Sequence, residues 1–412
     1  MKNDGAAEPE AGAADDLPEF PLTRECPFHP PSGYDELRAR GPVTEVRLFG
    51  GRTAWAVTGY AEARHVLADL AMSSDHHRPG FPHVAPALAA VKDQRSKRAL
   101  GALTRTDPPE HSKQRRMLIP SFTARRNAAL RPSIQRIVDA RLEAMLAQGP
   151  SADLVSAFAL PVASGTICEL LGVPYQDHDF FEEQARRRLI PEQVDDAFTA
   201  LIGYLDKLIE NKERSPGDGL LDDLVVEQVL PGRLERSELV RYALPLLLAG
   251  HDTSANMIAL SVLALLEQPE QLAALRTDPS LFPGAVEELL RYLSIVGSLA
   301  RVATQDIEVG GRRIRAGDGV LIAGGAANYD ETQFDRPREL DVRRADRHHL
   351  AFGYGLHQCI GQNLARTELE VALRTLFDRV PTLRLAVPAE DVPMKQGLFF
   401  GLEDLMVAWD RE

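Results

Sequence analysis

Cysteine is scarce in this chain of 412 residues. Only Cys26, Cys168 and Cys359 occur, and no two of them form a C-x-x-C pair. An odd number of widely spaced cysteines suits a reducing compartment and excludes both a disulfide framework and a four-cysteine iron–sulfur site. Any metal bound through sulfur must therefore be held by a single thiolate.

Long apolar runs and a surplus of basic residues are also lacking. No hydrophobic stretch reaches the roughly 20 residues that span a bilayer. The net charge of -13 argues against nucleic acid as the main partner, because phosphate binding needs a basic surface. The first residues, MKNDGAAEPEAGAADDLPEF, have neither the basic start nor the apolar block of a signal peptide. We therefore expect a cytoplasmic protein without a membrane anchor, led by a disordered acidic tail over residues 1–18.

Helical periodicity dominates the rest of the sequence. Apolar residues recur at helical spacing around residues 127–148, 153–171, 192–213, 234–266 and 282–292. Strand patterns are fewer, and consist of a hairpin about Gly50-Gly51 and short segments near 298–323 and 381–410. A stretch of weak periodicity lies between about 324 and 358, and such stretches are usually functional. The sequence predicts one domain over 19–412, mainly α with a smaller β region.

The stretch FGYGLHQCIG, Phe352 to Gly361, places Cys359 directly ahead of an amphipathic helix. A helix N-terminus favours an anion, so the cysteine can be held as the thiolate that binds metal. The glycines would let the backbone approach a flat cofactor, and Phe352 would shield the sulfur from water. A lone cysteine is usually a small buried hydrophobe. The complete pattern F-G-x-G-x-H-x-C-x-G, however, is expected by chance at odds of only about 10⁻⁵ over a chain of this length.

This stretch resembles the haem-binding loop of the cytochrome P-450 family, and the resemblance covers nearly the whole chain. AGHDTSAN, Ala249 to Asn256, is similar to the oxygen-activating segment of the family's central helix. EELLR contains the pair Glu288-x-x-Arg291, and DPPEHSKQRR and SLARVATQDIEVGG are similar to two haem-contacting segments. RECPFHPPSGYDELRARGPV and SSDHHRPGFP resemble the soluble actinomycete members. The resemblance implies the cytochrome P-450 fold and haem b ligated by the thiolate of Cys359.

The resemblance also implies which residues act on oxygen and hold the haem. Thr253 would hydrogen-bond the iron-bound oxygen while Asp252 relays protons, although such a pair alone more often marks a solvated helix face. Cationic or donor groups would neutralise the two buried propionates. Other matched residues would contact the macrocycle or leave room for O₂. The implied cofactor-binding residues are Cys359, His111, Arg115, Arg301, His357, Phe352, Gly353, Gly361, Ala249 and Gly250.

Three further matched residues have an implied structural role, and two segments depart from the family pattern. Glu288 and Arg291 would form a buried ion pair with Arg344 that pins the long loop under the haem. Pro245 lies inside the central-helix segment and predicts a kink or irregular first turns. Met406 stands where the family more usually has proline, which puts only a local turn in doubt.

The implied reaction is insertion of one oxygen atom from O₂ into a bulky hydrophobic molecule, by hydroxylation or epoxidation of a polyketide, macrolide, terpenoid or similar secondary metabolite or xenobiotic. The residues expected to line the substrate pocket are Leu248, Ala249, Ile295, Val296, Leu299, Leu398 and Phe399. No redox domain is recognisable in the chain. Electrons would therefore pass from NAD(P)H through a ferredoxin reductase and a ferredoxin to a monomeric enzyme.

An acidic ferredoxin would dock on a basic patch beside the cysteine, made of Lys113, Arg116, Arg343, Arg344 and Arg347. Alternatives that keep the same fold are a peroxygenase, a desaturase or a carbon–carbon coupling enzyme. A non-catalytic haem-binding recruiter is a further alternative. The intact Asp252-Thr253 pair argues against the peroxygenase and the recruiter, because such family members tend to lack it.

Overall fold

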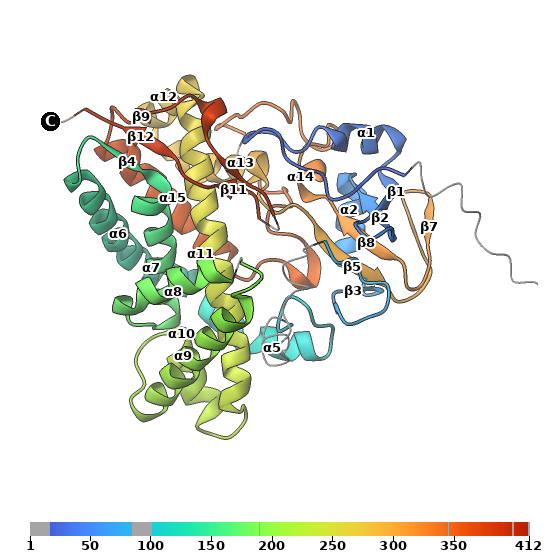
Figure 1. Cartoon of the computed structure of the whole chain (residues 1–412), viewed down its shortest axis with the longest axis horizontal. Coiled ribbons are helices and arrows are strands. Elements are labelled where there is room, and N and C mark those ends of the chain that lie inside the picture. The colour runs from blue at the N-terminus through green and yellow to red at the C-terminus, as the bar shows by residue number, and fades with distance from the viewer. Residues whose placement is uncertain (1–16, 85–100, 189, 345, 398, 411–412) are drawn as a thin grey trace, which may run out of the picture.

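The computed structural model of the chain describes residues 17–84, 101–188, 190–344, 346–397 and 399–410 (Figure 1). The predicted acidic tail therefore falls outside the described residues, except for Leu17 and Pro18. The carbonyl oxygen of Pro18 accepts a 2.8 Å hydrogen bond from the backbone N–H of Arg47. This bond ties the end of the predicted tail to the edge of a sheet.

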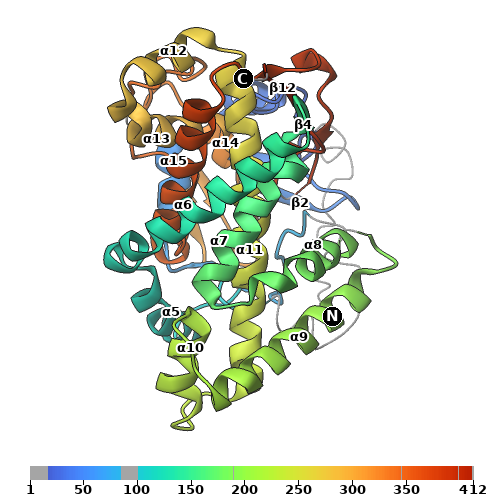
Figure 2. The ribbon, with the colours of Figure 1, turned by 90° about the vertical axis from the view of Figure 1, so that its left-hand side faces the viewer.

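The central element is helix α11, Arg236–Leu266. Its first turn is closed by a capping box between Glu235 and Glu238. Apolar residues surround most of its circumference, and the helix packs against α7 (Leu160–Leu171), α9 (Val194–Arg214) and α15 (Gln362–Arg379). Figure 2 shows α11 at the centre of this helical layer, with α6 and α7 on the side toward the viewer.

Helix α11 runs from Arg236 to Leu266 as one assigned element, with Pro245 inside it. The predicted irregular first turns are therefore not seen, because the surrounding packing keeps the segment helical although proline cannot donate the backbone hydrogen bond. The alternative, a kink at Pro245, stays a prediction. Among the helices that the structure describes, α11 alone has the length and composition to cross a membrane. It is mostly buried inside the protein, as the core helix of a large helical layer is.

The other helices cover the central one or flank the sheet. The periodic segments predicted at 127–148, 153–171, 192–213 and 282–292 correspond to α6, to a π-helical turn that runs into α7, to α9 and to α13. The α-helices whose bounds have not yet been given are α1 Gly33–Arg40, α2 Tyr60–Ala68, α5 Glu110–Leu118, α6 Ala124–Ala147, α8 His178–Arg187, α10 Leu220–Leu224, α12 Pro269–Thr277, α13 Phe282–Leu293 and α14 Gly324–Ala327.

A five-stranded sheet with the order β1-β2-β8-β5-β3 lies beside the helical layer, on the right in Figure 1. Its strands are β1 Val43–Arg47, β2 Thr53–Val57, β8 Gly319–Ile322, β5 Leu299–Ala303 and β3 Met72–Ser73. The hairpin predicted about Gly50-Gly51 joins β1 to β2. Strand β5 pairs antiparallel with β8, and Arg301 lies opposite Val320. This register places Arg301 in the middle of its strand.

Smaller sheets lie near the C-terminus and at the edge of the β region. Strands β4 (Ser151–Asp153), β12 (Met406–Ala408) and β9 (Arg384–Leu385) form one sheet, β10 (Met394–Lys395) pairs with β11 (Gly401–Leu402), and β6 (Ile307–Val309) pairs with β7 (Arg312–Ile314). Beyond α14, the described residues of the weakly periodic stretch form turns, irregular segments and the 3₁₀ turn Gly355–His357 before Cys359. The prediction of a mainly α fold with a smaller β region is confirmed.

Candidate active site: a cavity between the central helix and the cysteine loop

A cavity of about 480 Å³ lies between α11, β5 and the loop that precedes α15. Most of its wall is apolar, with contributions from α7, α13 and the segment after β3. Cys359, Thr253 and Arg301 all line it, although 106 and 58 residues separate Cys359 from the other two in the sequence (359 - 253 and 359 - 301). The fold therefore brings the predicted metal ligand and the predicted catalytic hydroxyl to one cavity.

The cysteine loop has a conformation that depends on glycine. The N–H of Cys359 donates a 2.9 Å hydrogen bond to the carbonyl of Phe352, which closes the loop into a compact turn. Gly355 has φ of 71°, and a Cβ on it would lie 2.4 Å from the carbonyl oxygen of Leu67. No other residue fits there without moving α2. The sequence pattern is therefore explained by close packing of the loop against α2.

The thiol of Cys359 belongs to the cavity wall, and its ionisation is set by opposing effects. Cys359 is accessible from the cavity, but the protein that encloses the cavity raises the pKa of its thiol by desolvation. The N–H of Gly361 and the nearby guanidinium groups of Arg115 and Arg366 act in the opposite direction by favouring the thiolate. The sulfur is thus poor as a free thiolate and suited to a partner that carries positive charge, such as a metal ion.

Four cationic or donor side chains meet on another part of the wall. His111 and Arg115 come from α5, Arg301 from β5 and His357 from the cysteine loop. The rings of His111 and His357 lie 4.0 Å apart. Burial lowers the pKa of Arg301 to about 10, while burial and the charges of Arg301, His111 and Arg115 lower the pKa of His357 to about 3.

This cluster lacks anionic partners within the described part of the chain. Neither Arg115 nor Arg301 has a carboxylate at ion-pair distance, and the buried Nδ1 of His111 has no hydrogen-bond partner. Arg301 donates only to the carbonyl of Ala300, at 2.8 Å. Buried cations and donors left in this way fit a ligand that brings its own carboxylates. The two propionates of a haem, with its iron at Cys359, meet that requirement.

Helix α11 presents Thr253 to the cavity and holds Asp252 behind it. Thr253 Oγ1 donates a 2.6 Å hydrogen bond to the carbonyl of Ala249, one turn earlier. Ala249 and Gly250 line the cavity, whereas Asp252 forms an ion pair with Arg188 just beyond α8. Burial lowers the pKa of Arg188 to about 10, and the Nε2 atom of His251 lies 3.9 Å from Asp252 Oδ1. The acid and the alcohol are adjacent in sequence but have different surroundings.

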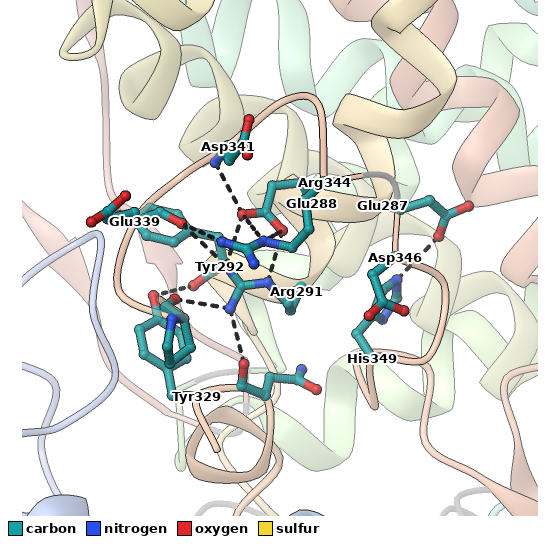
Figure 3. A network of polar contacts seen from close by, with 12 residues as sticks. Glu287, Glu288, Arg291, Tyr292, Tyr329, Glu339, Asp341, Arg344, Asp346 and His349 are labelled. Carbon is teal, nitrogen blue, oxygen red and sulfur yellow. Dashed lines mark hydrogen bonds and ion pairs between the residues drawn. The ribbon is translucent and has the colours of Figure 1, made fainter. Parts of the chain in front are cut away.

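Glu288 and Arg291 lie fully buried on α13, in the network drawn in Figure 3. Arg291 holds the carboxylate of Glu288 with two bonds, at 2.7 Å from Nε and 2.8 Å from Nη2. Arg344 Nε lies 3.1 Å from the same carboxylate, and Arg291 Nη1 donates to the carbonyls of Asn328 and Pro337 at 2.9 Å each. The network therefore fastens the long irregular stretch to α13, as the sequence predicts.

Comparison with known proteins gives the family. The cytochrome P-450 family model matches residues 187–400. Pentalenic acid synthase of Streptomyces avermitilis is 54% identical over 394 residues, which cover 95% of this chain and 97% of that protein. The chain belongs to the cytochrome P-450 family.

Further members agree in sequence and in structure. Vitamin D3 dihydroxylase of Streptomyces griseolus is 50% identical, over 96% of this chain and 97% of that protein. The crystal structure of mycinamicin VIII C21 methyl hydroxylase of Micromonospora griseorubida, bound to mycinamicin VIII, superposes with a TM-score of 0.88 at 42% identity. That superposition covers 95% of this chain and 100% of the other. The cytochrome P-450 fold and the assignment as an oxidoreductase follow from these relationships.

Most residues predicted to line the substrate pocket of this cytochrome P-450 are on the cavity wall. Ala249, Ile295, Val296, Leu299 and Phe399 all line it. Leu248 does not, and this prediction is corrected by the structure: Leu248 lines a small separate cavity beside His251. Neighbouring helix residues point about 100° apart, so a wall that includes Ala249 turns Leu248 away. Leu398 lies outside the described residues.

The predicted docking patch needs a similar correction. Lys113 and Arg116 on α5 and Arg343 are exposed, as a docking surface requires. Arg344 instead is 12% exposed and belongs to the Glu288 network. Arg347 is exposed but lies 3.4 Å from the carboxylate of the buried Glu287.

Two groups near the cysteine loop were not predicted. Glu287 accepts a 2.8 Å hydrogen bond from Arg366 Nε and lies 3.1 Å from His349 Nε2, and Figure 3 shows Glu287 and His349 beside the Glu288 network. The guanidinium of Arg366 stacks 4.6 Å from the centre of the Phe352 ring. The sequence feature that could have indicated Arg366 is its position one helical turn after Gln362. Gln362 Oε1 accepts a 2.9 Å hydrogen bond from Arg366 Nη1.

The second group is a buried acid. Glu368 of α15 lines the cavity and is fully surrounded by protein, and burial raises the pKa of its carboxyl to about 8. Ser254 Oγ donates to Glu368 Oε2 at 2.5 Å, and Thr166 of α7 lies on the same part of the wall. Glu368 is nine residues after Cys359 (368 - 359), on the apolar side of the helix with Leu364 and Leu369. That position is the only sequence signal for it.

Proposed function

We propose that this cytochrome P-450 is a monooxygenase that inserts one oxygen atom from O₂ into a bulky hydrophobic small molecule, a secondary metabolite or xenobiotic. The observation that supports the proposal most is the shared wall of Cys359 and Thr253 in one largely apolar cavity. Relatives named as hydroxylases and synthases of natural products support the same substrate class, and one of them is named for an organic acid. We place the enzyme in the cytoplasm.

The haem would be held by Cys359 and would supply O₂ activation, which a thiolate ligand favours. The residues of the chain then have distinct tasks. Arg115, Arg301, His111 and His357 would hold the propionates, and the backbone carbonyl of Phe352 closes the loop that carries the sulfur. The apolar wall excludes water from the reacting centre.

Thr253 would orient a proton toward the cavity once its hydroxyl turns away from Ala249. Asp252 would deliver that proton from the outer side of α11, where its carboxylate is partly exposed beside Arg188. Because Asp252 is next to Thr253 but outside the apolar cavity, its carboxyl group can exchange protons with water between turnovers. The intact pair favours O₂-driven oxidation over use of peroxide.

Electrons would come from NAD(P)H through a ferredoxin reductase and an acidic ferredoxin. The exposed cations Lys113 and Arg116 lie on α5, the helix that also holds His111 and Arg115, so a docked partner would lie close to the haem edge. Lys113→Glu, Arg116→Glu and Arg347→Glu together are expected to abolish the salt dependence of electron transfer. An unchanged salt dependence would exclude this surface as the dock.

The decisive first experiment is the difference spectrum of the reduced protein with and without carbon monoxide. A strongly red-shifted Soret band identifies a thiolate on iron. Turnover with a surrogate ferredoxin and reductase then separates a monooxygenase from a silent haem binder. A protein with the thiolate spectrum that forms no oxygenated product from any hydrophobic compound in a broad panel would refute the monooxygenase proposal.

A further inference from the structure

Arg105 is a further cation on the wall of the large cavity, in addition to Arg115 and Arg301. It lies in the segment before α5, is partly buried, and burial lowers the pKa of its guanidinium. Among the described residues, no carboxylate lies at ion-pair distance from it. The nearby acid Asp107 is already engaged, because it accepts from Ser73 Oγ and from the N–H of Ser74 and pairs with Arg78.

Arg105 belongs to a different electrostatic neighbourhood from the four propionate-binding residues. The positive charge of Arg105 contributes to lowering the pKa values of His76 and His83, after burial as the first cause. The pKa values of His111 and His357 are lowered by burial and by Arg115 and Arg301 instead. The cavity wall therefore carries Arg105 and His83 in addition to the four residues that we assign to the propionates.

The surroundings of Arg105 offer further hydrogen-bond donors to a ligand. His83 lines the cavity, with its ring 5.3 Å from that of Phe81. Ser74 also lines the cavity, and its buried hydroxyl has no hydrogen-bond partner among the residues that the structure describes. Because the pKa values of His76 and His83 lie below the ordinary value, both rings are neutral near pH 7 and Arg105 carries the charge. His77, Asp75 and Arg52 are the remaining charged or titratable groups around them.

We propose that Arg105, with His83 as a second donor, forms an anion-binding end of the substrate cavity, and that the enzyme selects hydrophobic substrates that carry a carboxylate. A guanidinium holds a carboxylate with two parallel hydrogen bonds, and a partly desolvated site strengthens both. The rest of the wall is apolar, so the ligand is an amphiphilic acid rather than a fully polar anion. This inference rests on the proposed function, because it names the substrate class of the same cavity.

The test compares acids with their own methyl esters in the ferric holoenzyme. Dodecanoic, lithocholic and abietic acid, each paired with its ester, differ in scaffold but share the carboxylate. Dissociation constants come from the optical spin-state change and, for ligands that cause none, from equilibrium dialysis. The wild type is expected to bind at least one acid about tenfold or more tighter than its ester, as a buried charge-assisted bond allows. Arg105→Gln is expected to abolish that preference and leave ester binding unchanged.

Two variants serve as controls. Arg105→Lys keeps the charge but loses the two-bond geometry and is expected to retain part of the preference. Arg52→Gln removes an exposed arginine whose contact is a 3.4 Å hydrogen bond to the carbonyl of Phe81 and which does not line the cavity. It is expected to bind acids and esters as the wild type does.

Three results would overturn the proposal. The first is no preference for any acid in the wild type, and the second is an equal loss of acid and ester binding in Arg105→Gln. The third is faster haem transfer from Arg105→Gln to apomyoglobin, which would assign Arg105 to a propionate. The failure of the proposed function is a separate result: acid selectivity with a normal carbon monoxide spectrum but no oxygenated product would refute the monooxygenase and leave the anion site standing.

Discussion

Ser254 Oγ donates a 2.5 Å hydrogen bond to Glu368 Oε2 and thereby joins α11 to α15 inside the protein. One of these helices carries Thr253, and the other begins three residues after Cys359 (362 - 359). The bond therefore links the two elements that place the catalytic hydroxyl and the metal ligand on one cavity. A carboxyl group in such a position is expected to be neutral, because no cation is bound to it in the described structure.

The protonation of Glu368 predicts a dependence of stability on pH. Burial raises its pKa to about 8, compared with 4.5 for an ordinary glutamate. Between these values the folded state holds a proton that the unfolded chain has lost. The free energy of unfolding therefore decreases as pH rises through this window, by up to about 1.4 kcal/mol per pH unit. Glu368→Gln is expected to remove this contribution and flatten the profile.

Urea unfolding of the holoprotein between pH 5 and 8.5 measures the effect. Glu370→Gln is the matched control on the same helix, because Glu370 pairs with Arg131 near the surface at 2.6 Å. It is expected to keep the wild-type slope. Parallel profiles for the wild type and Glu368→Gln would show that the carboxyl is ionised in the folded state.

Thr253→Ala is predicted to separate electron consumption from product formation. Without the hydroxyl, Thr253 could no longer orient a proton toward the cavity, and reducing equivalents would be lost as hydrogen peroxide. The product formed per NAD(P)H is expected to fall about tenfold or more, while NAD(P)H consumption continues. Thr253→Ser keeps the hydroxyl and should keep most of the coupling. Product, peroxide and NAD(P)H are measured together, and tight coupling in Thr253→Ala would rule out the proton-orienting role.

Glu288→Gln is predicted to destabilise the protein rather than change its chemistry. Glu288 is fully buried and receives Arg291 and Arg344, so an uncharged partner leaves two buried guanidinium groups without compensation. Loss of one partner of such a pair costs about 3–5 kcal/mol, and haem incorporation should fail with it.

The measurement for Glu288→Gln is haem content per chain together with urea unfolding. Arg313→Gln breaks an exposed ion pair with Asp306 and should leave haem content and stability close to those of the wild type. A Glu288→Gln protein with full haem content and wild-type stability would show that the charge of Glu288 does not contribute to the stability of the fold.

The sequence predicts those parts of the site that depend on local backbone chemistry. The cysteine loop and the hairpin at Gly50-Gly51 follow from glycines at positions that require them. Glu368 could not be found in this way, since a carboxylate on a helix normally faces water and is almost never fully buried. Leu248 was misplaced because helical periodicity fixes the angle between neighbours but not the rotation of the whole helix.

Ion pairs between residues that are distant in the sequence could not be predicted from it either. Arg344 was assigned to a buried network and to a surface patch at once, and only the packing around Glu288 decides between them. The ion pair between Asp252 and Arg188 joins residues that are 64 positions apart, and no local sequence pattern predicts it.

The stacking of Arg366 on Phe352 predicts an effect on the haem potential. Arg366 Nε donates a 2.8 Å hydrogen bond to Glu287, and the guanidinium lies over the ring of Phe352. The backbone carbonyl of Phe352 in turn accepts from the N–H of Cys359. A positive charge near the cysteine favours the state with the extra electron. Arg366→Gln is therefore expected to lower the reduction potential, by up to about 60 mV for a tenfold change in the one-electron equilibrium.

The comparison that isolates charge from packing uses Arg366→Lys. Lysine keeps the positive charge but loses the planar stack. The haem reduction potential of Arg366→Lys should therefore stay close to that of the wild type if charge is the cause. Arg374→Gln, which breaks an exposed contact of 3.7 Å with Asp378 on the same helix, should leave the potential unchanged. Spectroelectrochemical titration measures all four proteins, with the carbon monoxide spectrum as a check on the thiolate. Equal shifts in Arg366→Gln and Arg366→Lys would instead mean that the arginine acts by holding Phe352 in place.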